Sequence, residues 1–260
     1  MTYVALTIAG SDPSGGAGIQ ADLKTYHQFG VFGTSVVTLL TVQNTVEVRA
    51  VETLPADLVV AQLRAVIEDI PPAAAKTGAL GNTEIILSLA DLAARFDFPL
   101  VVDPVMVSKH GAVLLPNDAC AALSERLLPC AALVTPNLHE ASMLAGMHVS
   151  DLVSMRESAI RISRLGAKSV LVKGGHLAGD AVDVLYHAGD FLQFTAPRAE
   201  TRHTHGTGCT YSAAITAGLA MGRSLPEAVG AAKRFITRAI ESNPGLGRGC
   251  GPVNHFVDTQ

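Results

Sequence analysis

The sequence predicts a single α/β domain whose mainly parallel central sheet is flanked by helices. Short strand-like runs that are apolar on both faces recur along the chain, as in parallel strands buried between helices. Segments with helical spacing of apolar residues separate these runs, which is typical of βαβ units. Hydrophobic residues make up 48% and charged residues 16% of the 260 residues, a composition that supports one large core.

Strand-like runs and amphipathic helices alternate through most of the chain. The strands are expected at 3–10, 34–44, 73–80, 99–106, 131–137 and 168–175. The helices between them are expected at 55–70, 82–96 and 154–167. Because a parallel pair needs a long crossover, and a helix supplies one, this alternation predicts that successive strands run in the same direction.

The pattern changes after Gly175. Residues 181–198 alternate as in a β-hairpin that turns at 188–190. Helices are expected at 206–222 and 225–242, followed by a glycine-rich segment at 243–253. No repeat, low-complexity tract or linker interrupts the chain, so residues 1–260 are predicted to form one domain.

Charge and cysteine content narrow the class of protein. The net charge is −4 and no basic tract occurs, so neither nucleic acid nor a membrane surface is expected as a partner. No apolar run reaches the roughly 18 residues that span a bilayer, and the first residues lack the features of a signal peptide. The cysteines have no CxxC pairing and no zinc-site spacing (Cys120, Cys130, Cys209 and Cys250). We therefore expect a cytoplasmic enzyme with reduced cysteines.

Polar residues follow the predicted strands at the points where the strands end. In a parallel α/β sheet, ligands bind beyond the carboxyl ends of the strands. Each of these residues on its own could be an ordinary cap or turn residue, but together they predict a site at this edge. The residues are Asp12, Gln43, Asn44, Lys76, Asp103, Asn137, Glu140 and Lys173.

The stretch "THGTGCT" (204–210) precedes the apolar helix expected from Gly206. Its glycines allow a tight turn, and the first amides of a helix lack intrahelical partners, so they can point at an anion. Gly206 to Cys209 is therefore a candidate cradle for a phosphate or an oxyanion. The alternative is a capped helix start with a buried cysteine, because free cysteine commonly packs as a small hydrophobe.

Several common enzyme motifs are absent. No Gly-Lys dipeptide occurs, which excludes a Walker A loop, and "HEASM" lacks the second histidine of a zinc-protease helix. No GxSxG nucleophile elbow occurs. "GLGRGCG" follows no strand, so it is a weak dinucleotide signal. The motifs that remain are "GSDPSGGAGIQADLKTYHQFG", "VVDPVM", "TPNLHEA", "LVKGGH" and "THGTGCT".

These motifs, in this order between about Ala5 and His255, closely resemble those of the hydroxymethylpyrimidine and phosphomethylpyrimidine kinases of thiamine biosynthesis. The resemblance implies a ribokinase-like three-layer sandwich that uses ATP and Mg²⁺. It implies that 4-amino-5-hydroxymethyl-2-methylpyrimidine is phosphorylated on its hydroxymethyl oxygen and that the phosphate is then phosphorylated again. It also implies a homodimer whose partners are the small pyrimidine and ATP. A pyridoxal or pyridoxine kinase, with dual activity included, is the alternative that stays open.

The resemblance also implies catalytic roles. The amides of Gly206, Thr207, Gly208 and Cys209 would hold the γ-phosphate oxygens during transfer. Cys209 stands where most of the superfamily has an aspartate base. Because a helix N-terminus lowers a thiol pKa, its thiolate would accept the hydroxyl proton. In the alternative interpretation, Cys209 only fills space.

By the same resemblance, Asp22, Gln43 and Gly10 contact the pyrimidine. The alternative for Asp22 is a solvated acid in the first turn of a helix. "KTGAL" has Ala79 where the family often has methionine, so the fit of the pocket around the ring is in question.

For the nucleotide, the resemblance implies contacts from Asn137, Lys173, Lys109 and Thr207, and for Mg²⁺ it implies Glu140 and Asp103. Asn137 and Glu140 also have the spacing of a capping box, and both roles can hold at once. Asp103 could instead have a structural role at its strand end. His205 is expected to be an exposed loop histidine or a ligand contact.

Overall fold

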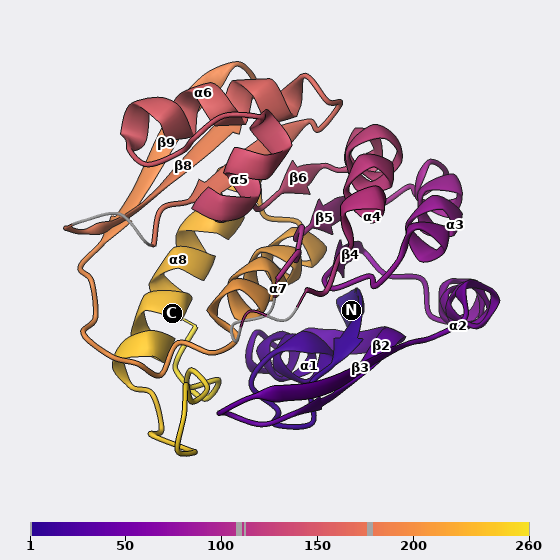
Figure 1. The fold of residues 1–260 in the computed structure, drawn as a ribbon, viewed down its shortest axis with the longest axis horizontal. Helices are drawn as coiled ribbons and strands as arrows, with labels where there is room; N and C mark the ends of the chain where they lie inside the picture. The colour runs from indigo at the N-terminus through magenta and orange to yellow at the C-terminus, as the bar shows by residue number, and fades with distance from the viewer. Residues whose placement is uncertain (1, 108–110, 112, 176–178, 260) are drawn as a thin grey trace.

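A nine-stranded sheet runs through the computed structural model, which describes residues 2–107, 111, 113–175 and 179–259 (Figure 1). The strand order is β3-β2-β1-β4-β5-β6-β7-β8-β9, with parallel pairing from β2 to β7 and antiparallel pairing at both ends. The strands are β1 (Val4–Ser11), β2 (Phe32–Gln43), β3 (Val48–Thr53), β4 (Ala74–Thr77), β5 (Leu100–Val102), β6 (Leu133–Val134), β7 (Ser169–Lys173), β8 (Ala181–His187) and β9 (Asp190–Ala196).

Helices cover both faces of the sheet. One layer holds α2 (Ala56–Asp69), α3 (Thr83–Ala93), α4 (Asn117–Ala122), α5 (Leu138–Ala145) and α6 (Leu152–Ser163). A π-helical segment (Leu123–Leu127) and a 3₁₀ turn (Leu128–Cys130) follow α4. The other layer holds α1 (Gly18–Gln28), α7 (Thr207–Ala220) and α8 (Leu225–Glu241).

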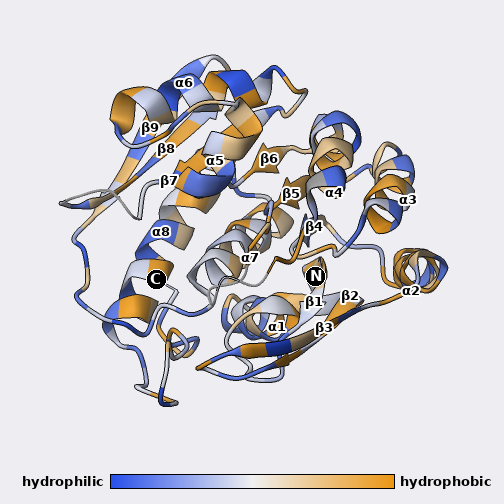
Figure 2. Ribbon diagram, viewed as in Figure 1, coloured by the Kyte–Doolittle hydropathy of each residue, from blue (hydrophilic) through white to orange (hydrophobic). Residues whose placement is uncertain are grey.

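Successive residues of the central strands enter different cores. In β5, Val101 packs with α7 and α8, whereas Val102 packs with the α2–α6 layer. Leu133 and Val134 divide in the same way in β6. Figure 2 shows these strands as apolar on a ribbon whose outer helices carry hydrophilic residues. This two-sided burial is the physical reason for the apolar runs in the sequence, and it confirms the predicted three-layer α/β fold.

The predicted strands and helices are found, but β5 and β6 are shorter than predicted, with 3 and 2 residues, and β3 and α4 are absent from the sequence prediction. Most residues of β3 are exposed, and it pairs only with β2, so it has no apolar alternation to detect. An edge strand of this kind is held by its backbone ladder more than by side-chain burial.

The glycine-rich C-terminal segment packs against the tip of the β2–β3 hairpin (Figure 1). The amide of Gly249 donates to Thr45 Oγ1 at 3.3 Å. Farther along, the His205 amide donates to Gly251 O at 3.0 Å and the Val253 amide donates to His205 O at 3.3 Å. Residues that are distant in sequence therefore meet at the carboxyl edge of the sheet.

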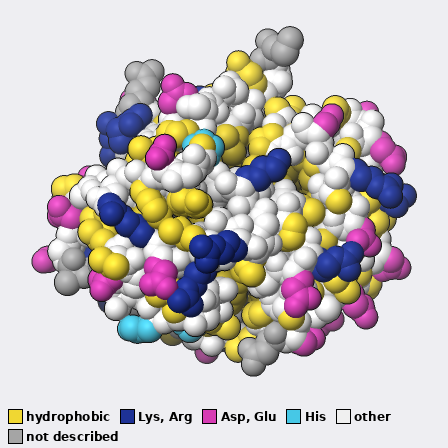
Figure 3. All heavy atoms as spheres, turned by 90° about the horizontal axis from the view of Figure 1, so that it is seen from above, with side chains coloured by type: hydrophobic (Ala, Val, Ile, Leu, Met, Phe, Trp, Pro, Cys, Tyr) yellow, Lys and Arg dark blue, Asp and Glu magenta, His cyan; other side chains and the backbone are white. Residues whose placement is uncertain are grey.

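Basic, acidic and apolar side chains are interspersed on the face seen in Figure 3. Such mixing gives that face no single-sign field to attract a polyanion. Within the described ranges, no helix is both long enough and apolar enough to cross a membrane.

Candidate active site

A cavity of about 820 Å³ opens at the carboxyl edge of the parallel strands. Its walls come from the ends of β1, β2, β4, β5 and β7 and from the N-terminus of α7. The sequence-predicted residues that line it are Gly10, Asp12, Gln43, Asp103, Asn137, Glu140, Lys173, His205, Gly206, Thr207, Gly208 and Cys209, and Ala79 lies in its wall. Lys109 lies outside the described residues.

The anion loop (Gly206–Cys209) begins α7 without a capping side chain. Gly206 has a φ of 77°, and a Cβ there would overlap the carbonyl oxygen of Gly16, so only glycine fits. The Thr207 amide and hydroxyl both donate to Thr204 O, at 3.3 and 2.8 Å. Among the described residues, the amides of Gly208 and Cys209 have no protein acceptor, so these two are available to an anion.

Lys173 brings a positive charge to the same loop. A Cβ added to Gly208 would lie 3.4 Å from Lys173 Nζ and 3.9 Å from Asp103 Oδ2. Lys173 Nζ donates to Asp103 Oδ1 at 3.0 Å, and the other Asp103 oxygen accepts from Ser212. Burial alone would raise the pKa of Asp103, but Lys173 holds it below its usual value. Asp103 therefore stays ionised and keeps Lys173 beside the anion loop.

Asn137 and Glu140 form a capping box at the start of α5. The Glu140 amide donates to Asn137 Oδ1 at 2.9 Å, and the Asn137 amide donates to Glu140 Oε2 at 2.8 Å. Burial raises the pKa of Glu140 to about 7, although Lys173 opposes this shift. The capping box gives both residues a structural role. Because both also line the cavity, they remain candidates for a ligand-binding role as well.

The acidic residues fit a Mg²⁺ ion only if other ligands complete its coordination. Across the residues that the structure describes, no three His, Cys, Asp or Glu side chains form a cluster that could hold a metal ion. Mg²⁺ in kinases is commonly held by one or two carboxylates together with water and substrate phosphates. Glu140 and Asp103 in the same cavity fit that arrangement.

The Cys209 thiol differs from its prediction. Desolvation by the surrounding protein raises the pKa of Cys209 to about 11, although Lys76 and the Gly18 amide oppose this shift. The expectation that the helix N-terminus lowers this pKa is therefore wrong, because desolvation outweighs the helix field. The thiol is protonated near neutral pH.

Asp22 lies beneath the cavity instead of lining it. Its side chain and that of Lys76 are fully buried, and Lys76 Nζ lies 2.7 Å from Asp22 Oδ1. Thr7 Oγ1 donates to the second oxygen, Oδ2, at 2.6 Å. Both the solvated-acid alternative and the direct pyrimidine contact predicted for Asp22 are therefore corrected. The carboxylate forms a buried ion pair in the floor of the site.

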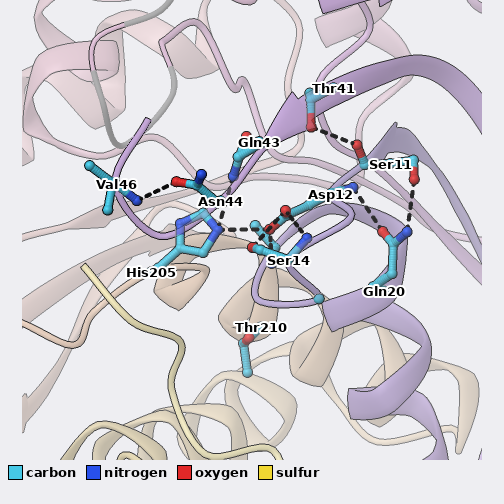
Figure 4. A network of polar contacts seen from close by, with 12 residues as sticks. Ser11, Asp12, Ser14, Gln20, Thr41, Gln43, Asn44, Val46, His205 and Thr210 are labelled. Atoms are coloured by element: carbon cyan, nitrogen blue, oxygen red, sulfur yellow. Dashed lines mark hydrogen bonds and ion pairs between the residues drawn. The ribbon is translucent and has the colours of Figure 1, made fainter. Parts of the chain in front are cut away.

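His205 is not the exposed loop histidine that the sequence analysis offered as one alternative, and its role as a ligand contact stays a prediction. It is buried, not exposed, and its Nε2 lies 2.7 Å from Asp12 Oδ2 and 3.1 Å from the Gln43 amide nitrogen (Figure 4). Asp12 also accepts from the amides of Ser14 and Ala17, at 2.8 and 2.9 Å, so it shapes the loop before α1. No local pattern around His205 could have indicated this pairing.

A second half of the cavity was also missed. It is lined by Asp183, Pro197, Arg198, Lys233, Ile236, Thr237 and Ile240. Lys233 Nζ lies 2.7 Å from Asp183 Oδ2 and donates to Ala181 O at 2.8 Å. The available signal was a lysine on the otherwise apolar face of the last helix.

Comparisons with known proteins agree with this geometry. The profile of the phosphomethylpyrimidine kinase family matches residues 12–254. The chain is 49% identical over 250 residues to the hydroxymethylpyrimidine/phosphomethylpyrimidine kinase of Streptomyces coelicolor, with 96% of this chain and 93% of that protein covered.

Two further similarities bear on the site. The chain is 52% identical over 254 residues to the thiamine biosynthesis bifunctional protein ThiED of Geobacter sulfurreducens. The similarity covers 97% of this chain but only 52% of the length of that relative, so this chain spans about half of it. Among solved structures, an ADP complex of Bacillus subtilis pyridoxal kinase matches with a TM-score of 0.91 and 41% identity, covering 98% of both chains.

Proposed function

Because this chain belongs to the phosphomethylpyrimidine kinase family, we propose that the cavity at the carboxyl edge of its sheet is where a phosphoryl group passes from ATP to the pyrimidine. The chain is a phosphotransferase that phosphorylates 4-amino-5-hydroxymethyl-2-methylpyrimidine to its phosphate and then to its pyrophosphate, for thiamine biosynthesis. The observation that carries the assignment of the site is the anion loop, whose open amides belong to residues that line the same cavity as Lys173 and Gln43.

The chemistry follows from charge and position. Phosphoryl transfer needs in-line positioning and stabilisation of the charge on the moving group more than it needs covalent catalysis. The Gly208 and Cys209 amides and the Lys173 ammonium supply that stabilisation. In the first step the thiolate form of Cys209, a minor fraction near neutral pH, accepts the hydroxymethyl proton. The second step needs no base, because its nucleophile is a phosphate that is already ionised.

Mass spectrometry of the products formed from ATP, Mg²⁺ and the hydroxymethylpyrimidine tests this function. We expect the monophosphate first and the pyrophosphate second. A parallel assay with pyridoxal tests the second candidate function, which the similarity to pyridoxal kinase supports. Turnover of pyridoxal alone would replace the pyrimidine assignment, whereas turnover of both would establish dual activity.

Gln43 is proposed to recognise the pyrimidine ring from the end of β2. Gln43→Ala should raise the KM for the pyrimidine by about 10-fold to 100-fold, because one or two hydrogen bonds in a closed site contribute about 1–3 kcal/mol. The KM for ATP should stay within about twofold of wild type and serves as the internal control. An unchanged KM for the pyrimidine would refute the contact.

Mg²⁺ is proposed to accompany ATP, where it would neutralise phosphate charge, with Glu140 accepting hydrogen bonds from its water ligands. Glu140→Gln preserves the capping box, since glutamine also serves at that position. At pH 8 the variant should need about 10-fold more Mg²⁺ for half-maximal rate.

The pH dependence gives this prediction its control. With a pKa of about 7, Glu140 is about nine-tenths ionised at pH 8 and about nine-tenths protonated at pH 6. The difference between wild type and Glu140→Gln should therefore shrink as the pH falls. Equal Mg²⁺ requirements at pH 8 would leave Glu140 with the capping role alone.

We also propose a homodimer that works in the cytoplasm. β2 exposes Phe32, Leu40 and Val42, with 54%, 47% and 56% of their surface accessible, and a second copy that packs against this strand could cover them. Cytoplasmic location is supported by the need for ATP and by cysteines that form no disulfide among the described residues. Sedimentation equilibrium tests the dimer, and a monomer mass at all concentrations would contradict it.

A further inference from the structure

One ring nitrogen of His205 faces two polar groups from different parts of the chain (Figure 4). Its Nε2 lies 2.7 Å from Asp12 Oδ2, in the loop after β1, and 3.1 Å from the side-chain amide of Gln43, at the end of β2. His205 and Asp12 are both buried, whereas Gln43 is partly exposed to the cavity. The three side chains therefore connect the interior to the proposed ring-binding wall.

Asp12 determines where the His205 proton lies. A carboxylate only accepts hydrogen bonds, so a contact of 2.7 Å requires a hydrogen on Nε2. This holds for the neutral ring protonated on Nε2 and for the imidazolium ion. Burial alone would raise the pKa of Asp12, but its hydrogen bond with His205 holds the pKa below the usual value. His205 Nε2 is therefore a donor.

A donor at this position dictates the orientation of the Gln43 amide. An NH₂ group cannot donate to a nitrogen that itself carries a hydrogen, whereas an amide oxygen can share the single Nε2 hydrogen with Asp12 in a bifurcated bond. Turning the amide by 180° exchanges its nitrogen and oxygen without changing its shape, so the hydrogen on Nε2 decides which of the two atoms faces the imidazole. The chemistry therefore places Oε1 against His205 and directs the NH₂ group toward the cavity.

The imidazole is held on several sides, so it cannot turn to suit Gln43. A Cβ on Gly16 would lie 2.5 Å from the ring atom Cδ2, which shows how closely that backbone approaches the ring. The His205 amide and carbonyl are bonded to Gly251 and Val253. Asp12 is fixed in turn by two backbone amides of its own loop.

We infer that the Asp12–His205 pair fixes the orientation of the Gln43 amide and thereby makes Gln43 read the hydrogen-bonding pattern of the substrate ring. This inference rests on the proposed contact of Gln43 with the pyrimidine. A 4-aminopyrimidine offers an NH donor beside the N3 acceptor, whereas its 4-oxo analogue offers a C=O acceptor beside an N3–H donor. A fixed amide pairs with only one of these patterns, and a freely rotating amide pairs with both.

The test compares kcat/KM for 5-hydroxymethyl-2-methylpyrimidines that carry a 4-amino or a 4-oxo group. The wild type should prefer the amino compound by more than about 10²-fold, because a mismatched polar pair leaves buried groups unpaired. His205→Leu should reduce this preference by at least about 10-fold, since the amide can then rotate. The KM for ATP should be unchanged. A structural defect would instead lower kcat/KM for both compounds equally and leave their ratio intact.

His203→Leu is the matched control, because His203 lies two positions away and accepts from the Gly251 amide at 3.2 Å. It should leave the substrate preference unchanged. In a Gln43→Ala background, His205→Leu should cause no further change in the ratio, which would show that His205 acts through Gln43. If His205→Leu fails to fold, Asp12→Asn should reduce the preference in its place, because its amide can also donate and no longer requires a hydrogen on His205 Nε2.

The negative results of these experiments distinguish a failure of the inference from a failure of the proposed function. An unchanged preference in a folded His205→Leu or Asp12→Asn variant overturns the inference, as does a wild type that uses both compounds equally well. A wild type that phosphorylates neither compound overturns the proposed function itself, and the inference with it. A Gln43→Ala variant with unchanged KM and unchanged preference removes the ring contact on which the inference rests.

Discussion

Cys209→Ala should lower the turnover number of the first phosphorylation by about 10²-fold to 10⁴-fold, the usual effect of losing a general base. The cradle should survive, because the open amides of Gly208 and Cys209 belong to the backbone. Binding of ATP and of the pyrimidine should therefore stay near normal. The second phosphorylation should change little, since its phosphate nucleophile needs no base. Single-turnover assays of each step, started from the alcohol or from the monophosphate, measure the two effects separately.

The raised pKa of Cys209 adds a pH signature to this prediction. With a pKa of about 11, only about 10⁻⁴ of the enzyme carries the thiolate at pH 7. With the thiolate as the proposed proton acceptor, kcat/KM of the first step should rise about tenfold per pH unit between pH 7 and pH 10. The second step should be flat over this range, and the slope should disappear in Cys209→Ala.

Two outcomes would refute the base role of Cys209. Equal losses in both steps would indicate that Cys209 shapes the loop without accepting a proton. Full first-step activity in Cys209→Ala would indicate that the hydroxyl proton passes late to the phosphate itself. Cys209→Asp supplies the aspartate that most of the superfamily has at this position, and recovery of the first step in that variant would support proton acceptance.

Gly206→Ala should abolish most activity in both steps, with kcat falling by at least about 10²-fold. The added methyl group would overlap the Gly16 carbonyl, and the φ of 77° is unfavourable for alanine. The anion loop must therefore shift, which moves the Gly208 and Cys209 amides away from the phosphoryl group. Steady-state kinetics of both steps, with circular dichroism to verify folding, would measure this.

Gly222→Ala is the matched control for Gly206→Ala. Gly222, at the other end of α7, has a similar φ of 79°, but a Cβ there meets nothing within 4 Å. This variant should lose about 1–2 kcal/mol of unfolding free energy and keep its activity. If Gly206→Ala behaved like Gly222→Ala, loop geometry would have no catalytic role, and the assignment of the cradle would be wrong.

The layered fold could be predicted because a strand that is buried on both faces has a continuous run of apolar residues in the sequence. Val101 and Val102 enter opposite cores, so β5 reads as an uninterrupted apolar run, and the same holds for Leu133 and Val134. β3 has no such apolar run, because it is an exposed edge strand. The cradle was also visible, because glycines before an apolar helix are adjacent in sequence.

The three-layer fold, the sheet edge that carries the candidate site and the glycine loop that begins α7 all follow from local patterns in the amino-acid sequence. The partners of the polar side chains follow only from the folded arrangement of distant segments. Asp22 meets Lys76 across 54 positions, and Asp12 meets His205 across 193. Periodicity reports burial among near neighbours, but an ion pair, a tautomer or the pKa of Cys209 depends on desolvation and charges brought together by distant segments. Only the folded chain defines that environment.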